Sequence, residues 1–527
     1  MRPTILLIAL AFLPVASGRG APQPEQSFDL LIRGGQVVDG TGAPARAADI
    51  GITNGRVAAL GVLSSAAAPH IIDARGQVIS PGFIDVHTHA DEVAEHPLAE
   101  HFVQMGVTTV IAGNCGGSAE DIAALFRKIE QTRVSVNFAT LVGHNTVRRA
   151  VMGTARRAPN AAELISMQEL VRKAMSDGAV GFSTGLQYVP GTYADQAEIV
   201  ALARVAGSAG GVYASHMRNE GTELEKAVKE TLDIGEAAQV AVEISHLKVD
   251  APSRWGASAK ALAMIDAARA RGMKVAADVY LYDAASSNLG IRFPSWILEG
   301  GQPAINERLD DPAMWARIKE AMKQLIRERG IENYSFARIA SYPSDPSLNG
   351  LSVPNAAAKV LGQDDIEAQL EMMRRMLRAG GASMVYQFMA EDDIGRILRH
   401  PHVAIASDSG HNVMGQGVPH PRGYGNAARA LARYVRQLEV VSLEEAVRKM
   451  TSLPADQFGL RDRGRLAVGQ AADLVIFDPA KVTDRATYEQ PHQYPDGISA
   501  VLVNGVAVVD NGVHTQARPG QVWRHAR

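Results

Sequence analysis

The chain has 527 residues, of which 46% are hydrophobic and 21% are charged, and its formal net charge is −3 at pH 7. This composition is typical of a folded globular protein and is too hydrophobic for a disordered one. The sequence has no stripe of lysines and arginines interleaved with aromatic residues, so nucleic acid is not an expected partner.

The N-terminus has the pattern of a secretory signal. In MRPTILLIALAFLPVASG, the basic Arg2 precedes an apolar run from Ile5 to Val15, and small residues such as Ala16 follow. We therefore predict a signal peptide over residues 1–20 and export to the periplasm or the medium. No later apolar segment reaches about 20 residues, so stable membrane insertion is not expected after cleavage. An uncleaved N-terminal anchor is the alternative.

Two β-rich segments flank the rest of the chain. Residues 28–82 contain short apolar runs separated by Gly-Gly, Asp-Gly and Asn-Gly, which are typical of tight hairpins. Residues 464–515 repeat this pattern, with a further turn at Asn504-Gly505. A few strands alone bury little surface, so we predict that the two segments pair into one small β-sandwich.

The intervening residues 83–463 alternate strand-like runs with amphipathic helical stretches, about 30 residues apart, as successive βα units do. Eight such runs predict an α/β fold with a (β/α)8 TIM barrel. They are GFIDVHTH, GVTTVIAGNC, VSVNFATLVGH, GAVGFSTGL, GGVYASHM, VAVEISHLK, MKVAADVYLY and HVAIASDSG. Between the last two runs, residues 284–400 form an insert far longer than one helix needs, with a length that would suit a lid.

Residues able to bind a metal stand where several of these runs end. His87 and His89 are two apart at the end of the first run, so their side chains project to one face. The carboxyl ends of all barrel strands meet at the catalytic face, where neutral imidazoles and a thiolate could share a cation. The other residues at run ends are Cys115, His216, His246 and Asp408. One metal or two is left open by the sequence.

Cys115 is the only cysteine in the chain. A lone thiol in an exported protein cannot form an internal disulfide, so it is either a buried inert residue or a ligand. Its position among strand-end histidines favours the ligand interpretation, because a bound cation deprotonates and protects the thiol.

These motifs together resemble the amidohydrolase superfamily. The phrases GNCGGS, LVGHNTVR, GFSTGLQYVPG, YASHMRNEG, ISHLK and VPHPRGYG are similar to its N-acyl-D-amino-acid deacylase branch, the D-aminoacylases. The resemblance implies a zinc amidase in which one tight zinc is held by Cys115, His216 and His246. It also implies a second, weaker position lined by His87, His89 and Asp408. Many superfamily members have a carboxylated lysine on the fourth strand, whereas this chain has GFSTG without a lysine, and Cys115 is the expected substitute.

Zinc acidifies water and polarises a carbonyl group, which suits amide hydrolysis. Beside the metal, Asp408 is our candidate general base, able to take a proton from water and return it to the leaving amine. Pure ligation is the alternative role.

The carboxylate of an acylated amino acid requires cationic and hydroxyl donors. Candidates just beyond the sixth, seventh and eighth runs are Lys248, Tyr280, Ser286 and Arg422. His144 ends the third run and receives no role.

We therefore predict a zinc-dependent amidohydrolase that cleaves N-acyl-D-amino acids to a free D-amino acid and a carboxylate. One alternative is a cyclic-amide hydrolase of the hydantoinase or dihydroorotase kind, which the missing lysine disfavours. Another is a non-catalytic binding protein with this fold, which the complete ligand set disfavours. The preferred side chain, the acyl group and the oligomeric state are left open by the sequence.

Overall fold

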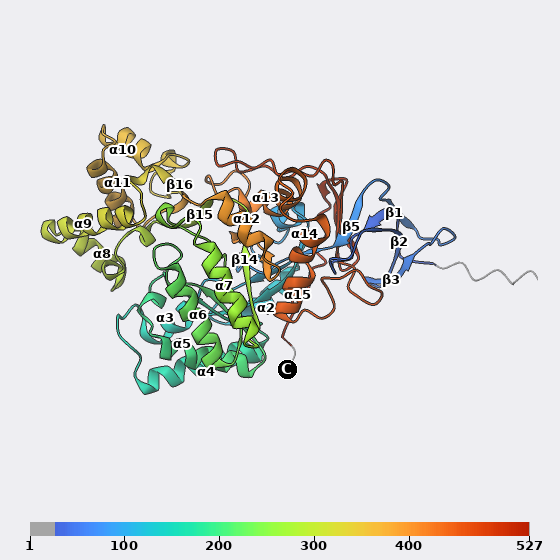
Figure 1. The fold of residues 1–527 in the computed structure, drawn as a ribbon, viewed down its shortest axis with the longest axis horizontal. Helices are drawn as coiled ribbons and strands as arrows, with labels where there is room; N and C mark the ends of the chain where they lie inside the picture. The colour runs from blue at the N-terminus through green and yellow to red at the C-terminus, as the bar shows by residue number, and fades with distance from the viewer. Residues whose placement is uncertain (1–26, 526–527) are drawn as a thin grey trace, which may run out of the picture.

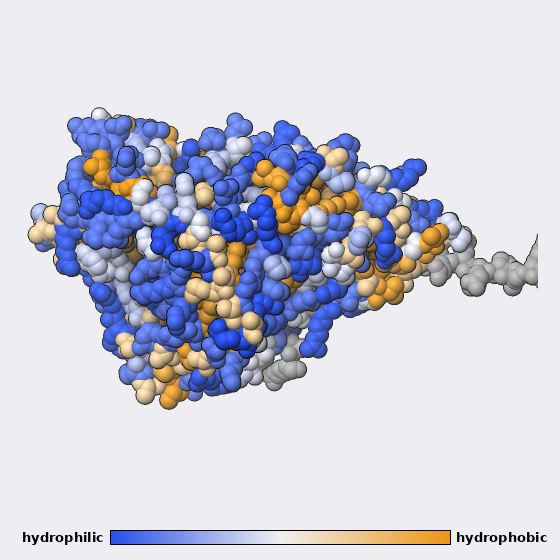
Figure 2. All heavy atoms as spheres, viewed as in Figure 1, coloured by the Kyte–Doolittle hydropathy of each residue, from blue (hydrophilic) through white to orange (hydrophobic). Residues whose placement is uncertain are grey.

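The computed structural model describes residues 27–525, so the predicted signal peptide at residues 1–20 lies outside the described residues. Figure 1 shows a small sheet at one end of the long axis, the barrel in the middle and a helical insert at the other end. The face in the same view is mostly hydrophilic, with scattered apolar groups (Figure 2). Within residues 27–525, no helix has both the length and the apolar character needed to cross a membrane.

The predicted eight-stranded barrel is confirmed. Parallel ladders run in the orders β6-β8-β9 and β10-β11-β12-β13-β14-β18, and β19 pairs with β7 to close the ring. All eight predicted runs supply strands. These are β6 (Phe83–Asp85) with β7 (Thr88–His89), β8 (Val107–Ala112), β9 (Asn137–Thr140) with β10 (Val142–Gly143), β11 (Gly181–Gly185), β12 (Val212–His216), β13 (Ala241–Ile244), β14 (Val275–Val279), and β18 (Val403–Ile405) with β19 (Ser409–Gly410).

Barrel strands are buried on both faces, which explains their nearly continuous apolar sequences. All six residues of β8 are buried, for example. Asp85 joins the first strand to the eighth, since its Oδ1 accepts a hydrogen bond from the Ser407 amide at 3.0 Å. The Asp408 amide also donates to the carbonyl oxygen of His87 at 2.9 Å. Burial of the Asp85 carboxyl raises its pKa to about 6, because the charged form is poorly solvated there.

Helices cover the outside of the barrel. Several begin at a side-chain cap: Asp121, Asn160 and Asp195 each accept a hydrogen bond from an amide three residues later, which is typically worth about 1 kcal/mol. The helices are α1 (Glu100–Gln104), α2 (Ile122–Thr132), α3 (His144–Met152), α4 (Ala161–Asp177), α5 (Gln196–Ser208), α6 (Leu224–Ala238), α7 (Ser258–Ala270), α12 (Glu391–Arg399), α13 (Arg422–Arg429) with a π-helical continuation over Ala430–Gln437, α14 (Leu443–Met450) and α15 (Ser452–Phe458).

The two terminal segments form one unit, as predicted, and hydrogen bonds join them into a single nine-stranded sheet. The junction is the antiparallel pair of β5 and β20. Buried residues of both segments share one apolar cluster, which includes Ile32, Ile50, Ile79, Leu474 and Leu502. The strands are β1 (Leu30–Val37), β2 (Arg46–Thr53), β3 (Arg56–Gly61), β4 (His70–Asp73), β5 (Val78–Pro81), β20 (Leu474–Phe477), β21 (Ile498–Val503), β22 (Val506–Asp510) and β23 (Val513–His514).

The insert between the last two barrel strands builds its own antiparallel sheet in the order β15-β17-β16. Its helices project away from the barrel in Figure 1, with β15 and β16 between them and the barrel. The elements are β15 (Ala284–Asn288), α8 (Gly301–Asp310), α9 (Pro312–Glu328), β16 (Ala337–Ser341), α10 (Val353–Leu361), α11 (Ile366–Arg378) and β17 (Ser383–Gln387). Arg329 fixes the insert to the loop after β13 through Asp250 Oδ1 at 2.6 Å. Movement of this insert as a lid stays a prediction.

Candidate metal centre and active site

The carboxyl ends of the barrel strands bring all six predicted ligands together. Their donor atoms form two groups, in each of which the atoms lie within 4.8 Å of one another. One group is Cys115, His216 and His246, and the other is His87, His89, Cys115 and Asp408. The sequence predicted both groups, but it assigned Cys115 to the first alone. In the structure, Cys115 belongs to both.

In the first group, Sγ of Cys115 lies 3.4 Å from Nε2 of His246 and 3.6 Å from Nδ1 of His216. The two histidine nitrogens are 2.8 Å apart. In the second group, Nε2 of His87 lies 3.3 Å from the same sulfur.

Asp408 completes the second group. Its Oδ1 lies 3.3 Å from Nε2 of His87 and 3.2 Å from Nε2 of His89. Its Oδ2 pairs with Nη1 of Arg422 at 2.8 Å. Burial opposes ionisation, but Arg422 and His87 outweigh it and hold the pKa of Asp408 well below its usual range. This carboxylate is therefore ionised, the form that binds a cation.

The donor set fits zinc. Thiolate and imidazole are the ligands that zinc prefers, and carboxylate is a third common type. Burial disfavours the Cys115 thiolate, but the charges of His87 and His246 and a hydrogen bond with His216 lower the pKa of the thiol well below its usual value. The sulfur is thus prepared to bind a cation.

Three of the six candidate ligands have a left-handed backbone. The φ angles are 52° for Cys115, 34° for His246 and 51° for Asp408. This region is unfavourable for residues with a side chain, and such strain concentrates at functional sites. The barrel therefore holds these side chains in conformations that an isolated turn would avoid.

Each buried histidine ligand has a second polar neighbour, which the sequence analysis did not identify. Oε1 of Gln187 lies 3.1 Å from Nε2 of His216, and Oε1 of Glu220 lies 2.9 Å from Nδ1 of His246. Asp278 approaches Nδ1 of His87 at 3.3 Å. Such partners fix ring orientation and leave the opposite nitrogen free for a metal. In the sequence, the only sign that these residues support the histidine rings is their location in a barrel strand or just after one.

Lys248 lies beside the first group rather than free in solvent. Its Nζ is 2.7 Å from Oε2 of Glu220 and 2.7 Å from Nδ1 of His246, and its side chain is almost wholly buried. Burial raises the pKa of Glu220, but Lys248 and His246 lower it much more, so the net pKa is well below the usual range. Lys248 still lines the active-site cavity, and its grip on a substrate carboxylate stays a prediction.

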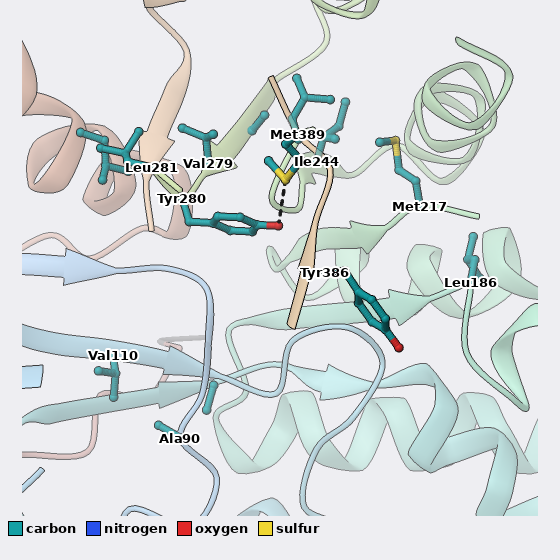
Figure 3. Packing of buried hydrophobic residues seen from close by; sticks show 14 of the residues in the cluster. Ala90, Val110, Leu186, Met217, Ile244, Val279, Tyr280, Leu281, Tyr386 and Met389 are labelled. Carbon is teal, nitrogen blue, oxygen red and sulfur yellow. Dashed lines mark hydrogen bonds between the residues drawn. The ribbon is translucent and has the colours of Figure 1, made fainter. Parts of the chain in front are cut away.

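A cavity of about 370 Å³ opens over the ligands, and the other predicted substrate residues also line it. Tyr280 directs its hydroxyl to Sδ of Met389 at 3.7 Å (Figure 3), while its ring lies 4.5 Å from the Arg422 guanidinium. Ser286 donates to the carbonyl oxygen of Met384 at 3.2 Å. His144 does not line this cavity, and its Nε2 lies 2.8 Å from a carboxylate oxygen of Glu198.

The cavity also contains two residues that sequence analysis missed. Tyr188 packs its ring 4.6 Å from that of His216, and its hydroxyl accepts a hydrogen bond from Ser287 at 3.1 Å. Arg292 enters from the insert, where no sequence motif marked it. The insert therefore supplies part of the cavity wall.

The arrangement suits hydrolysis of an amide. Zinc held by these ligands supplies Lewis acidity and acidifies a water molecule. Asp408 can take a proton at Oδ1 and later donate it to a leaving nitrogen, while Arg422 keeps the carboxylate in place through Oδ2.

Comparison with known proteins gives similarity over almost the whole chain. It is 39% identical over 523 residues to N-acyl-D-glutamate deacylase from Alcaligenes xylosoxydans xylosoxydans, covering 95% of this chain and 97% of that protein. The crystal structure of N-acyl-D-glutamate deacylase from Bordetella bronchiseptica, complexed with zinc and a phosphonate mimic of the tetrahedral intermediate, superposes with a TM-score of 0.81. It shares 38% identity and covers 95% of this chain and 100% of its own.

A structure of D-aminoacylase with a binuclear metal centre has a TM-score of 0.80 and 35% identity, covering 94% and 100% of the two chains. A D-hydantoinase has a TM-score of 0.56 at 16% identity, which shows a shared fold alone. The family model described as "Amidohydrolase family" matches residues 70–509, which include the barrel and both metal-binding groups. The chain belongs to the amidohydrolase family.

Proposed function

We propose that this protein is a zinc-dependent hydrolase of N-acyl-D-amino acids, which it converts to a free D-amino acid and a carboxylate. The observation that carries this function is the pair of metal-binding groups that share Cys115, the second of which includes Asp408. They lie at the base of a cavity that contains cationic side chains. Relatives with 35 to 39% identity that act on N-acyl-D-amino acids support the choice of substrate and of zinc.

Arg292 favours substrates with an acidic side chain. It is only 5% exposed and lines the cavity, and its Nε has no hydrogen-bond partner within the described chain. Its guanidinium lies 4.2 Å from the Tyr386 ring and 5.1 Å from that of Phe388, in place of a carboxylate. Burial and the nearby Arg329 lower the pKa of Arg292. A buried cation without an anionic partner is unfavourable, so a second substrate carboxylate would be stabilised here.

N-acyl-D-glutamate satisfies both cationic regions of the cavity. Its α-carboxylate would contact Lys248, and its side-chain carboxylate would contact Arg292. The similarity to N-acyl-D-glutamate deacylases supports this preference. A cyclic-amide hydrolase has less support, because the hydantoinase similarity extends only to the fold and β11 contains no lysine.

The test is a panel of N-acetyl-D-glutamate, N-acetyl-L-glutamate and N-acetyl-D-leucine with the zinc-loaded enzyme. We expect the D-glutamate derivative to exceed each of the others at least tenfold in kcat/KM. Arg292→Met should remove most of the preference over D-leucine. The matched control Arg317→Met, an exposed arginine over Trp296 in the same insert, should retain it. Absence of hydrolysis of every D-substrate would reject the function, and an unchanged preference in Arg292→Met would reject the role of Arg292.

A further part of the proposal is that the enzyme acts outside the cytoplasm. The support is the signal-like sequence of residues 1–20. Cell fractionation and N-terminal sequencing of the mature protein test it: a chain that retains Met1 in the cytoplasmic fraction would contradict export.

A further inference from the structure

The turn that carries Cys115 has a strained backbone. Gly113, Cys115 and Gly116 have left-handed φ angles of 74°, 52° and 77°. Glycine adopts this region readily, but Cys115 has a side chain, so its conformation persists only where the surroundings fix it. Its Sγ lies within 3.6 Å of nitrogen atoms of three histidines. A change in the backbone of this turn would therefore move the sulfur away from both metal-binding groups.

A hydroxyl group from another strand connects the residues on the two sides of Cys115. Ser183 lies in the middle of β11 and is fully buried. Its Oγ accepts a hydrogen bond from the amide of Gly116 at 3.1 Å and donates one to the carbonyl oxygen of Gly113. One hydroxyl thus bridges the turn and uses both its donor and its acceptor.

The backbone groups that Ser183 contacts belong to buried residues, Gly113 and Gly116. Without the hydroxyl, an amide and a carbonyl group in the interior would lose this partner, and unpaired buried groups are unfavourable. The turn would then rearrange to pair them elsewhere. Cys115 gains most from such a change, because it is the residue of the three whose side chain disfavours the left-handed region.

Other hydrogen bonds fix the turn to its neighbours without bridging it. The side-chain amide of Asn114 donates to the carbonyl oxygen of Val86 at 3.1 Å, which fixes the turn to the first barrel strand. The carbonyl oxygen of Gly116 accepts a hydrogen bond from the amide of Thr146 at 3.1 Å, which fixes the turn to α3. Neither contact joins the two sides of the turn, as the hydroxyl from β11 does.

We propose that Ser183 is a positioning residue for the metal centre, whose hydroxyl holds the turn in the conformation that places the Cys115 sulfur in both metal-binding groups. Neither group contains a residue of β11, so the fourth strand acts on the metal centre through this contact with the turn. The role differs from that of Glu220, which contacts His246, a member of the first group alone. This inference rests on the proposed zinc-dependent function.

Zinc affinity tests the proposal independently of activity. Ser183→Ala should weaken zinc binding roughly 10 to 100-fold in competition with a chelator, because the thiolate is no longer held beside the histidines. The matched control Ser135→Ala removes another buried serine hydroxyl, which donates to the carbonyl oxygen of Ala517 at 2.7 Å just before β9 begins. This control should bind zinc within twofold of the wild type. Equal zinc affinities in the two variants would overturn the proposal.

Cobalt in place of zinc reports on the sulfur directly, since bound Co²⁺ has a near-ultraviolet absorption band when a thiolate is among its ligands. At saturating cobalt, Ser183→Ala should lose at least half of this band. Glu220→Gln should keep the band although its affinity is lower, because Glu220 contacts a histidine and not the turn. An unchanged band in Ser183→Ala would overturn the positioning role, even if the variant is less stable than the wild type.

Hydrogen exchange of the metal-free wild type gives a test that needs no variant, in case Ser183→Ala does not fold. The amide of Gly116 should exchange at least 100-fold more slowly than in an unstructured chain, because Ser183 holds it before any metal binds. Exchange at the unstructured rate would overturn the proposal. Absence of zinc binding by the wild type would instead reject the zinc-dependent function on which this inference rests.

Discussion

The sulfur of Cys115 lies 3.3 Å from Nε2 of His87, which makes the single cysteine a member of both groups of metal-binding side chains. A thiolate in this position can contact a cation in either group. Cys115 has an unfavourable left-handed backbone, so the surrounding barrel must hold its side chain in this orientation. Cys115 therefore connects two sites that would otherwise depend on separate residues. The chain needs no fourth-strand lysine for that purpose, and β11 has none.

The first prediction concerns Glu220, which contacts His246 and Lys248 but is not itself in either metal-binding group. Glu220→Gln should weaken zinc binding roughly 10 to 100-fold, because loss of a charged partner reduces control of the ring and its basicity. Competition with a chelator of known affinity measures the dissociation constant for zinc independently of activity. Glu223→Gln, an exposed position three residues later, is the control. Identical zinc affinities in the two variants would exclude a positioning role for Glu220.

The second prediction concerns Asp408. Asp408→Asn keeps the size of the side chain but cannot accept a proton, so kcat for N-acetyl-D-glutamate should fall about 10² to 10⁴-fold. KM should change much less, since proton transfer matters chiefly in the transition state. Zinc content must be measured in parallel, because Asp408 belongs to the second metal-binding group. Near-normal turnover with normal zinc content would remove Asp408 from the chemistry.

The third prediction separates substrate binding from metal support at Lys248. Lys248→Met should raise KM for N-acetyl-D-glutamate at least tenfold, because the α-carboxylate loses its cation. The analogue with an α-carboxamide should already be a poor substrate of the wild type, and Lys248→Met should lower its kcat/KM little further. Lys248 also contacts His246, a candidate metal ligand. If kcat/KM falls by the same factor for both substrates, Lys248 acts through His246 and not through the substrate carboxylate.

The fourth prediction concerns stability and pH. Burial raises the pKa of Asp85 to about 6 in the fold, against about 3.9 in an unfolded chain. The folded state thus holds this proton more tightly, so the contribution to stability is fully present below pH 4 and is lost as the pH rises through 6. The loss amounts to about 3 kcal/mol. Asp85→Asn cannot titrate. The free energy of unfolding of both metal-free proteins is measured with denaturant at pH 4 and at pH 7.5. Over this range, the value for the wild type should fall by this amount relative to the value for Asp85→Asn. A difference between the two proteins that is constant with pH would contradict the assigned pKa.

The barrel and the positions of the candidate ligands were predictable because they depend on local patterns. Each barrel strand is an apolar run, and a residue at its end must lie at the catalytic face, so His216 and His246 could be placed without a structure. The register between neighbouring strands did not have to be predicted, because the carboxyl ends of parallel strands lie at the same face of the barrel.

Other features depend on long-range contacts that no local pattern reports. Glu220 reaches His246 from the loop after the neighbouring strand, and Arg292 enters from an insert whose orientation is set by contacts such as Arg329 with Asp250. The sequence also assigned Arg422 to a substrate carboxylate, and that role stays a prediction. The structure adds a contact that the sequence did not indicate, the pair of the Arg422 guanidinium with Asp408 at the edge of the cavity.

The most direct test of the central claim is a zinc titration of the metal-free enzyme, followed by release of D-glutamate from N-acetyl-D-glutamate. Activity should rise from background to a plateau as zinc fills the group of Cys115, His216 and His246, and Cys115→Ala should retain its fold but bind little zinc and release little product. Full activity without zinc, or a Cys115→Ala variant with normal zinc content and turnover, would contradict the account.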